Sequence, residues 1–217
     1  KMLSNKLVYA IGYNRSSAPW TSFIKNKINS RKTNIAMIIN GGELPLGHWL
    51  LNEKVCGGRI IGEFCHFIDL ALTLLSHTKL INVECINRDK HYQDTGNYIF
   101  NFEDGSKVNI NYRHDLPASV PKEKIIVKVS SSIYTNNNWK KFSNGKILNF
   151  SLVKKGKGHN EAISSFFHNV KNKNFSTKND IYEMCFSAYT AIKLQQMSKG
   201  NILNISDCYR DEILSKV

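Results

Sequence analysis

The chain has 217 residues, of which 41% are hydrophobic and 11% aromatic, so it can bury a core and is not expected to be disordered. Its longest apolar run, residues 60–75, is interrupted by three ionisable residues, which argues against a membrane span. Residues 1–6 lack a secretory signal pattern. The five cysteines form no CxxC pair and are odd in number, which is typical of free thiols in a reducing compartment. We therefore expect a cytoplasmic, globular protein without disulfides.

The formal net charge of +13 raises the question of nucleic-acid binding. However, 24 of the 30 basic residues are Lys, and they are spread along the chain without a recognition element. The 25 Asn residues beside them indicate a general compositional bias. Nucleic acid is therefore a disfavoured partner.

In the first third of the chain, residues 7–13 form a short apolar run that predicts a buried strand. After Pro19, residues 20–32 have helical spacing of apolar side chains. Residues 35–39 predict a second strand, residues 40–58 a glycine-containing loop, and residues 59–76 a helix.

The middle of the chain alternates apolar and polar residues, as half-buried strands do. The predicted strands are residues 80–87, 98–102, 107–113, 124–130, 133–142 and 146–153, with turns at 103–106 and 143–145. The end is helical again, with helices over 160–170 and from a cap at Asn179 or Asp180 to residue 198, then an edge strand at 202–205. This order predicts an α+β fold with an open, mainly antiparallel sheet and helices on one face.

A nucleotide cradle is missing from the sequence. No strand is followed by G-x-G-x-x-G, and no P-loop motif occurs. Gly156 and Gly158 lie in a basic turn that no predicted strand of the Rossmann type precedes. We therefore identify no cofactor-binding residue in this chain.

The ionisable residues of the 59–76 helix are the strongest candidates for chemistry. Glu63, His66 and Asp69 are three residues apart and form one stripe on an otherwise apolar helix. The stripe faces either a cleft or polar network, or simply the solvent. Glu63-x-x-His66 is half of a di-iron ligand set, but no second Glu-x-x-His occurs, so we expect no metal site.

Gly57-Gly58 through His66-x-x-Asp69 resembles the signature helix of the Gfo/Idh/MocA oxidoreductases (glucose–fructose oxidoreductase, inositol dehydrogenase and their relatives). Other segments match this family in the same order. They are Gly12 to Arg15 with Pro19, Asn40 to Pro45 with His48-Trp49, residues 94–112, and Gly158 to Glu161. The second of these resembles members linked to polysaccharide and nucleotide-sugar metabolism.

The resemblance implies a two-domain enzyme whose N-terminal Rossmann domain binds NAD or NADP. Residues 1–14 would be the last strand and exit of that domain, which this chain otherwise lacks, and residues 15–217 the substrate-binding domain. Family members transfer hydride at a secondary alcohol of a sugar, nucleotide sugar or cyclitol. Their sheet commonly forms dimers or larger homo-oligomers.

The resemblance also assigns roles. His66 corresponds to the family's acid/base, which suits imidazole because it exchanges a proton near neutrality. Asp69 would orient the helix or His66. The family's carboxylate one turn earlier falls on Gly62, so Glu63 is the candidate to replace it. The family's catalytic Lys belongs to the Rossmann half, so the chain is expected to be inactive alone.

Five further residues are candidate substrate contacts: Arg15, Asn40, His48, Trp49 and His159. Arg15 could bind a carboxylate or phosphate, and Trp49 could stack on a sugar face. The alternative interpretations are that Trp49 is a core residue and that His159 is an ordinary helix-start residue. The competing hypothesis for the whole chain is a non-catalytic binding or oligomerisation domain that keeps the fold.

Overall fold

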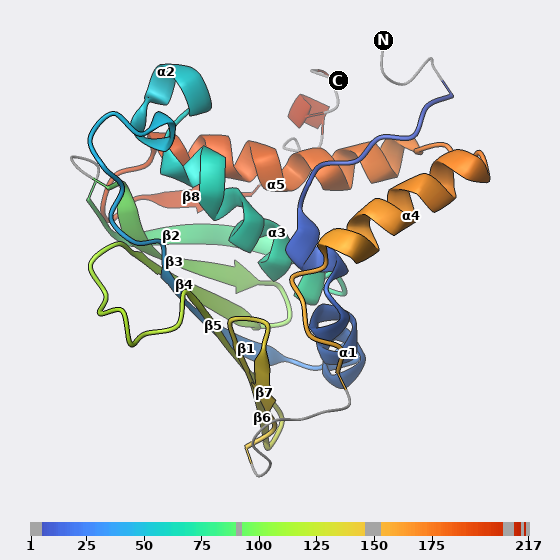
Figure 1. Ribbon diagram of the computed structural model, residues 1–217, viewed down its shortest axis with the longest axis horizontal. Helices are drawn as coiled ribbons and strands as arrows, with labels where there is room; N and C mark the ends of the chain where they lie inside the picture. The colour runs from blue at the N-terminus through green and yellow to red at the C-terminus, as the bar shows by residue number, and fades with distance from the viewer. Residues whose placement is uncertain (1–5, 90–92, 146–152, 206–210, 214, 216–217) are drawn as a thin grey trace.

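A computed structural model describes residues 6–89, 93–145, 153–205, 211–213 and 215 of the chain (Figure 1). Within them, eight strands form one sheet in the order β7-β6-β5-β1-β4-β3-β2-β8. Neighbouring strands run antiparallel except β1 and β4, which are parallel, so the prediction of an open, mainly antiparallel sheet is confirmed. The strands are β1 Thr33–Asn40, β2 Leu80–Asp89, β3 Thr95–Phe102, β4 Lys107–Arg113, β5 Glu123–Val129, β6 Ser132–Asn137, β7 Lys141–Ser143 and β8 Ile202–Asn204.

Helices cover one face of this sheet (Figure 1). The long ones are α1 Pro19–Ile28, α3 Cys65–Leu74, α4 His159–Lys171 and α5 Lys178–Gln196. Short helical turns are η2 Asn14–Ser17, η3 Trp49–Leu51, α2 Glu53–Cys56 and the π-helical turn η4 Ile60–Phe64. None of the helices in the described residues is both long and apolar enough to cross a membrane.

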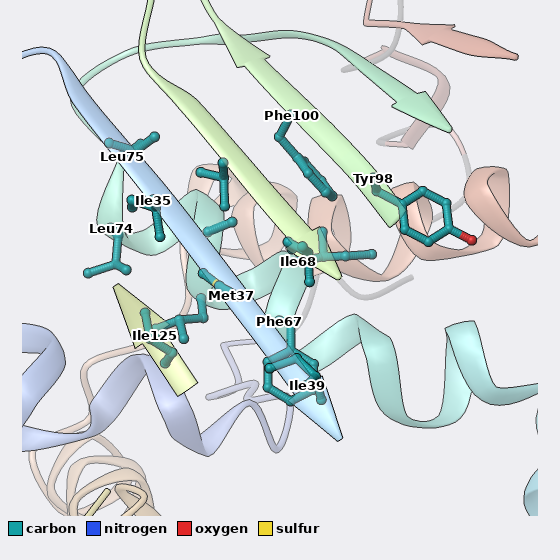
Figure 2. Close-up of a cluster of buried hydrophobic side chains, with 14 of the residues drawn as sticks. Ile35, Met37, Ile39, Phe67, Ile68, Leu74, Leu75, Tyr98, Phe100 and Ile125 are labelled. Atoms are coloured by element: carbon teal, nitrogen blue, oxygen red, sulfur yellow. The ribbon is translucent and has the colours of Figure 1, made fainter. Parts of the chain in front are cut away.

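The core lies between the sheet and α1, α3 and α5. In β1, Ile35, Met37 and Ile39 point to the helices and are 0–3% exposed, while the residues between them face the other side (Figure 2). Phe67 and Ile68 of α3 are buried against them. Each such side chain stabilises the fold by about 1.5–3 kcal/mol through burial. The strand face without helices carries polar residues and half-buried apolar ones, as expected for an open face.

Three sequence predictions were wrong in detail. Residues 7–13 form no strand, because no strand lies beside them; instead Ser176 N–H donates to the Leu7 carbonyl and Tyr9 N–H to Ser176 Oγ, each at 2.9 Å. The loop at 40–58 contains η3 and α2. The single strand at 133–142 is β6 and β7, separated by Asn138 and Trp139 at positive φ.

At the C-terminal end, α5 begins at Lys178 rather than after Asn179 or Asp180. Its cap is Thr177, whose hydroxyl accepts from Asp180 N–H while the Asp180 carboxylate accepts from Thr177 N–H. The edge strand β8 is confirmed. Of the predicted strand 146–153, residues 146–152 lie outside the described residues.

Candidate functional site

A cleft of about 290 Å³ opens at the end of the sheet where β1 and β4 finish and β5 starts. The turn η2, the turn η3, the π turn leading into α3, and the start of α4 surround it. It is lined by Asn14, Arg15, Trp49, Leu50, Gly62, Glu63, His66, Lys157 and His159. The structure therefore gathers five predicted site residues, from segments up to 144 positions apart in the sequence, in one place.

His66 is half-buried on α3 and lines this cleft. The ring of Tyr13 meets it edge-on, with centroids 5.6 Å apart. Burial, followed by the positive charge of Arg15, lowers the pKa of His66 to about 4. The imidazole is therefore neutral at neutral pH, and its buried Nδ1 has no hydrogen-bond partner among the described residues. A neutral imidazole in a cleft can accept a proton.

Beneath His66, Arg15 is held by a buried acid from β5. Arg15 Nε donates to Glu123 Oε2 at 2.9 Å, and Nη2 donates to Oε1 at 2.8 Å. The guanidinium also lies over the Phe67 ring, 4.5 Å from its centroid. A bidentate pair of this kind fixes both side chains, so Arg15 supplies charge to the cleft from a rigid position.

Glu123 also accepts from Trp139 Nε1 and from Lys157 Nζ, both at 2.6 Å. Burial alone would raise the pKa of Glu123. The hydrogen bonds and charge of Arg15, followed by the hydrogen bonds of Lys157 and Trp139, outweigh this effect of burial. They hold this pKa at about 2. Glu123 is thus a permanent carboxylate under the cleft, and its side chain has no exposed surface.

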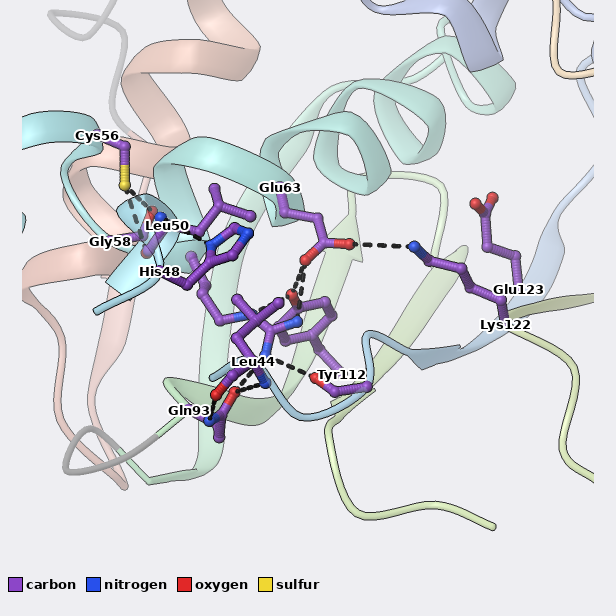
Figure 3. Close-up of polar contacts among 12 residues, drawn as sticks. Leu44, His48, Leu50, Cys56, Gly58, Glu63, Gln93, Tyr112, Lys122 and Glu123 are labelled. Atoms are coloured by element: carbon purple, nitrogen blue, oxygen red, sulfur yellow. Dashed lines mark hydrogen bonds and ion pairs between the residues drawn. The ribbon is translucent and has the colours of Figure 1, made fainter. Parts of the chain in front are cut away.

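Glu63 also lines the cleft and belongs to a second polar network (Figure 3). Its Oε2 accepts from Arg59 Nη2 at 3.0 Å and from the Tyr112 hydroxyl at 2.5 Å, and its Oε1 lies 4.0 Å from Lys122 Nζ. Arg59 is fully buried and also donates to Gln93 Oε1 at 2.8 Å. These contacts hold Glu63 as a fixed negative charge at the cleft.

Gly62, the position of the family's carboxylate, packs against the η3 turn. A Cβ there would lie 2.6 Å from Leu50 Cδ2, so no side chain fits without movement of Leu50. Among the described residues that line the cleft, Glu63 is therefore the one that carries a carboxylate.

Asp69 does not share the cleft with Glu63 and His66. It lies at a separate hollow of about 930 Å³ between α3, α5 and the segment around Tyr9. Its carboxylate accepts from Ser16 and, at 3.1 Å, from Ser187 Oγ, and burial raises its pKa to about 7. Asp69 therefore joins α3 to η2 and α5, and its hydrogen bonds go to Ser16 and Ser187 rather than to His66. Its orienting role stays a prediction. The interpretation of all three acidic and basic residues as one solvent-facing stripe is wrong.

The remaining candidates divide between the cleft and its surroundings. Trp49 is 56% exposed at the cleft, so it is not a core residue. His159, the first residue of α4, also lines the cleft. His48 and Asn40 do not: His48 Nδ1 accepts from Leu50 N–H, and Asn40 donates to the Leu116 carbonyl. Their part in binding stays a prediction.

Sequence reasoning missed Asn14, Lys157, Glu123, Arg59 and Tyr112. One signal was present for Glu123: it occupies an inward-facing position of an alternating strand, where an acid requires a buried partner. Tyr112 likewise occupies an inward-facing position, one residue before the end of β4. In the described part of the chain, no three His, Cys, Asp or Glu side chains are grouped as metal ligands would be.

With the fold and the cleft described, the chain can be compared with known proteins. No family model and no curated protein matches the sequence. Solved structures do match. One is an oxidoreductase from Thermotoga maritima, at 16% identity and a TM-score of 0.69, with 94% of this chain and 62% of that chain covered.

An inositol dehydrogenase homolog from Azotobacter vinelandii, complexed with NAD+, is similar at 13% identity and a TM-score of 0.69, with 94% of this chain and 66% of that chain covered. GenD2 from gentamicin A biosynthesis, in complex with NAD, is similar at 14% identity and a TM-score of 0.64, with coverage of 92% and 64%. The chain spans 62% of the length of the first structures it matches. It has the fold of the C-terminal domain of Gfo/Idh/MocA-type oxidoreductases, as the sequence predicted.

Proposed function

We propose that this chain is the substrate domain of an NAD(P)-dependent oxidoreductase that acts on a secondary alcohol of a sugar, nucleotide sugar or cyclitol. The observation that carries the proposal is His66, neutral and without a partner at Nδ1 among the described residues, in a cleft that charged side chains line. The similar structures that contain NAD support the cofactor class.

In the oxidative direction, His66 accepts the proton of the substrate hydroxyl as the carbon–oxygen double bond forms, and in the reductive direction it returns that proton. A bound nicotinamide supplies or takes the hydride in this class of enzyme. The described residues offer no glycine-rich cradle for its diphosphate, so this chain's part is to bind the substrate and move the proton. Glu63 and Arg15 fix the charges around His66, and Trp49 offers an exposed ring for a sugar face.

The experiment uses the complete reading frame that contains this chain and follows NAD(P)H absorbance over a panel of sugars, nucleotide sugars and cyclitols. We expect His66→Ala to lower kcat/KM by about 10²–10⁴-fold, the usual contribution of a general acid or base. His168→Ala, on the exposed part of α4, is the matched control. Activity that is unchanged in His66→Ala would refute the assigned role.

A non-catalytic binding domain is the second candidate, because Gly62 leaves the family's carboxylate position empty and packed against Leu50. It predicts no turnover with any substrate of the panel, while sugar binding persists. We further propose a homo-oligomer, as a dimer, through the open face of the sheet, a place in polysaccharide biosynthesis, and a cytoplasmic location. Sedimentation of the purified chain tests the first of these.

A further inference from the structure

Lys157 lines the cleft, and its ion pair with Glu123 does not fully neutralise its positive charge. Glu123 already receives three hydrogen bonds without it, two from Arg15 and one from Trp139. Lys157 Nζ adds a fourth on Oε1. Two positive charges therefore meet one negative charge, and one positive charge is unmatched at the floor of the cleft.

The two cations differ in exposure. The Arg15 side chain is 10% exposed and held in a bidentate pair, whereas the Lys157 side chain is 34% exposed and makes a single contact with Glu123. A flexible ammonium on a four-carbon stem can turn from one carboxylate to another at little cost. Lys157 is therefore the cation that can meet a ligand in the cleft.

The backbone of Lys157 is fixed although its tip is accessible. Asn14 Nδ2 donates to the Lys157 carbonyl at 2.8 Å, and Asn14 is only 6% exposed. The next residue, Gly158, has φ of +88° and lies so close to η2 that a Cβ would be 2.2 Å from the Asn14 carbonyl oxygen. The close approach of this turn to η2 places Lys157 in the same cleft as His66.

No other group in the described cleft cancels this charge. Glu63, the acid among the lining residues, is already matched by the buried Arg59 and by the Tyr112 hydroxyl. The N-terminus of α4 begins at His159 without a side-chain cap and adds a partial positive charge at the same place. Lys122, 4.0 Å from Glu63 Oε1, does not line the cleft, so for the lining residues and their buried partners the surplus is about one charge. A surplus of this size suits a carboxylate better than a phosphate monoester of about −1.5 to −2.

We propose that Lys157 is a specificity residue and that the cleft binds a sugar acid, a substrate whose carboxylate pairs with Lys157 while a neighbouring carbinol faces His66. The placement of the carbinol at His66 rests on the proposed function. The carboxylate subsite does not, because it follows from the charges and contacts of Lys157. The ammonium swings from Glu123 to the ligand, and Arg15 and Trp139 continue to satisfy Glu123.

The test measures binding, by NMR titration of the 217-residue chain with D-glucuronate, D-glucose and D-glucose 6-phosphate. We expect glucuronate to bind at least about tenfold more tightly than glucose, the worth of one hydrogen bond to a charged group. The preference should shrink as salt is raised, and glucuronate but not glucose should raise the pKa of His66. Equal affinity for the two sugars, or no glucuronate binding, overturns the proposal, and tighter binding of glucose 6-phosphate overturns the choice of a carboxylate.

Lys157→Met should abolish the preference for glucuronate, whereas Lys154→Met, which removes an exposed lysine paired with Glu161, should keep it. Should the methionine variant fail to fold by circular dichroism, Lys157→Gln is the second variant, and a retained preference in either folded variant overturns the assignment. Failure of the proposed function gives a different result: the complete enzyme shows no turnover while the preference for glucuronate persists. Turnover of neutral sugars without a preference for glucuronate overturns the carboxylate subsite alone.

Discussion

Replacement of Glu123 by Gln removes the carboxylate that pairs with Arg15 in the described part of the chain. Glu123→Gln keeps the size of the side chain but leaves the buried guanidinium and Lys157 facing a neutral amide. Loss of one partner of a buried pair costs about 3–5 kcal/mol, because the other charge is left uncompensated. We therefore expect a loss of this size in the free energy of unfolding near neutral pH.

The pH dependence gives an independent magnitude. The pKa of Glu123 is about 2 in the folded chain against an ordinary 4.5. A lowered acid pKa stabilises the fold above the ordinary value, and this stability is lost as the pH falls through the folded value. The lowered pKa of Glu123 contributes about 3 kcal/mol of stability in all, of which about 2 kcal/mol is lost between about pH 6 and pH 3.

The assay is urea unfolding of the wild-type and Glu123→Gln chains across this pH interval. The difference in stability between them should narrow by about 2 kcal/mol as the pH falls. Asp115→Asn is the control: hydrogen bonding by Arg113 also holds the pKa of Asp115 at about 2, but that pair is exposed and screened by solvent. A difference that stays constant with pH for Glu123→Gln, or that narrows equally for Asp115→Asn, would refute the reasoning.

Two further substitutions, Asp69→Asn and Gly158→Ala, should change the stability of the fold in different ways. Asp69, whose pKa burial raises to about 7, contributes stability that is lost as the pH rises through that value, by at most roughly 4 kcal/mol. Asp69→Asn should remove this decline in urea unfolding between about pH 5 and pH 8, and an unchanged decline would contradict the assignment. Gly158→Ala should lower the thermal midpoint strongly, because its Cβ would meet the Asn14 carbonyl at 2.2 Å; Gly12→Ala, with nothing within 4 Å, should not.

The elements that sequence patterns predicted well are those whose burial is one-sided and local. The strand at 107–113 has the predicted bounds because its inward positions, Val108, Ile110 and Tyr112, alternate strictly with polar residues. The apolar run at 7–13 has the composition of a strand but no neighbouring strand to pair with. Its apolar composition did not predict burial either, since Leu7 and Ile11 are 48% and 42% exposed, and strand pairing depends on distant parts of the chain.

The candidate site was predicted in part for the same reason. The resemblance gave His66, Glu63, Arg15, Trp49 and His159, which do line one cleft. It did not give Glu123 or Lys157, since the ion pairs that Glu123 forms join residues 108 and 34 positions apart. The three-residue spacing grouped Asp69 with His66 in one stripe, whereas in the structure Asp69 lines a different hollow.

The central position of β1 has a consequence for the order in which the chain can fold. In the described sheet β1 pairs with β4, which ends at Arg113, and with β5, which ends at Val129. One edge of β1 therefore stays unpaired until 73 more residues have followed Asn40, and the other until 89 have. At a synthesis rate of about 5–20 residues per second the longer interval lasts roughly 4–18 s. Throughout it, Ile35, Met37 and Ile39 lack at least one of the strands that flank them in the sheet, and a strand with an unpaired edge can pair with another chain instead. The nascent protein is thus most exposed to aggregation before residue 129 and least after it.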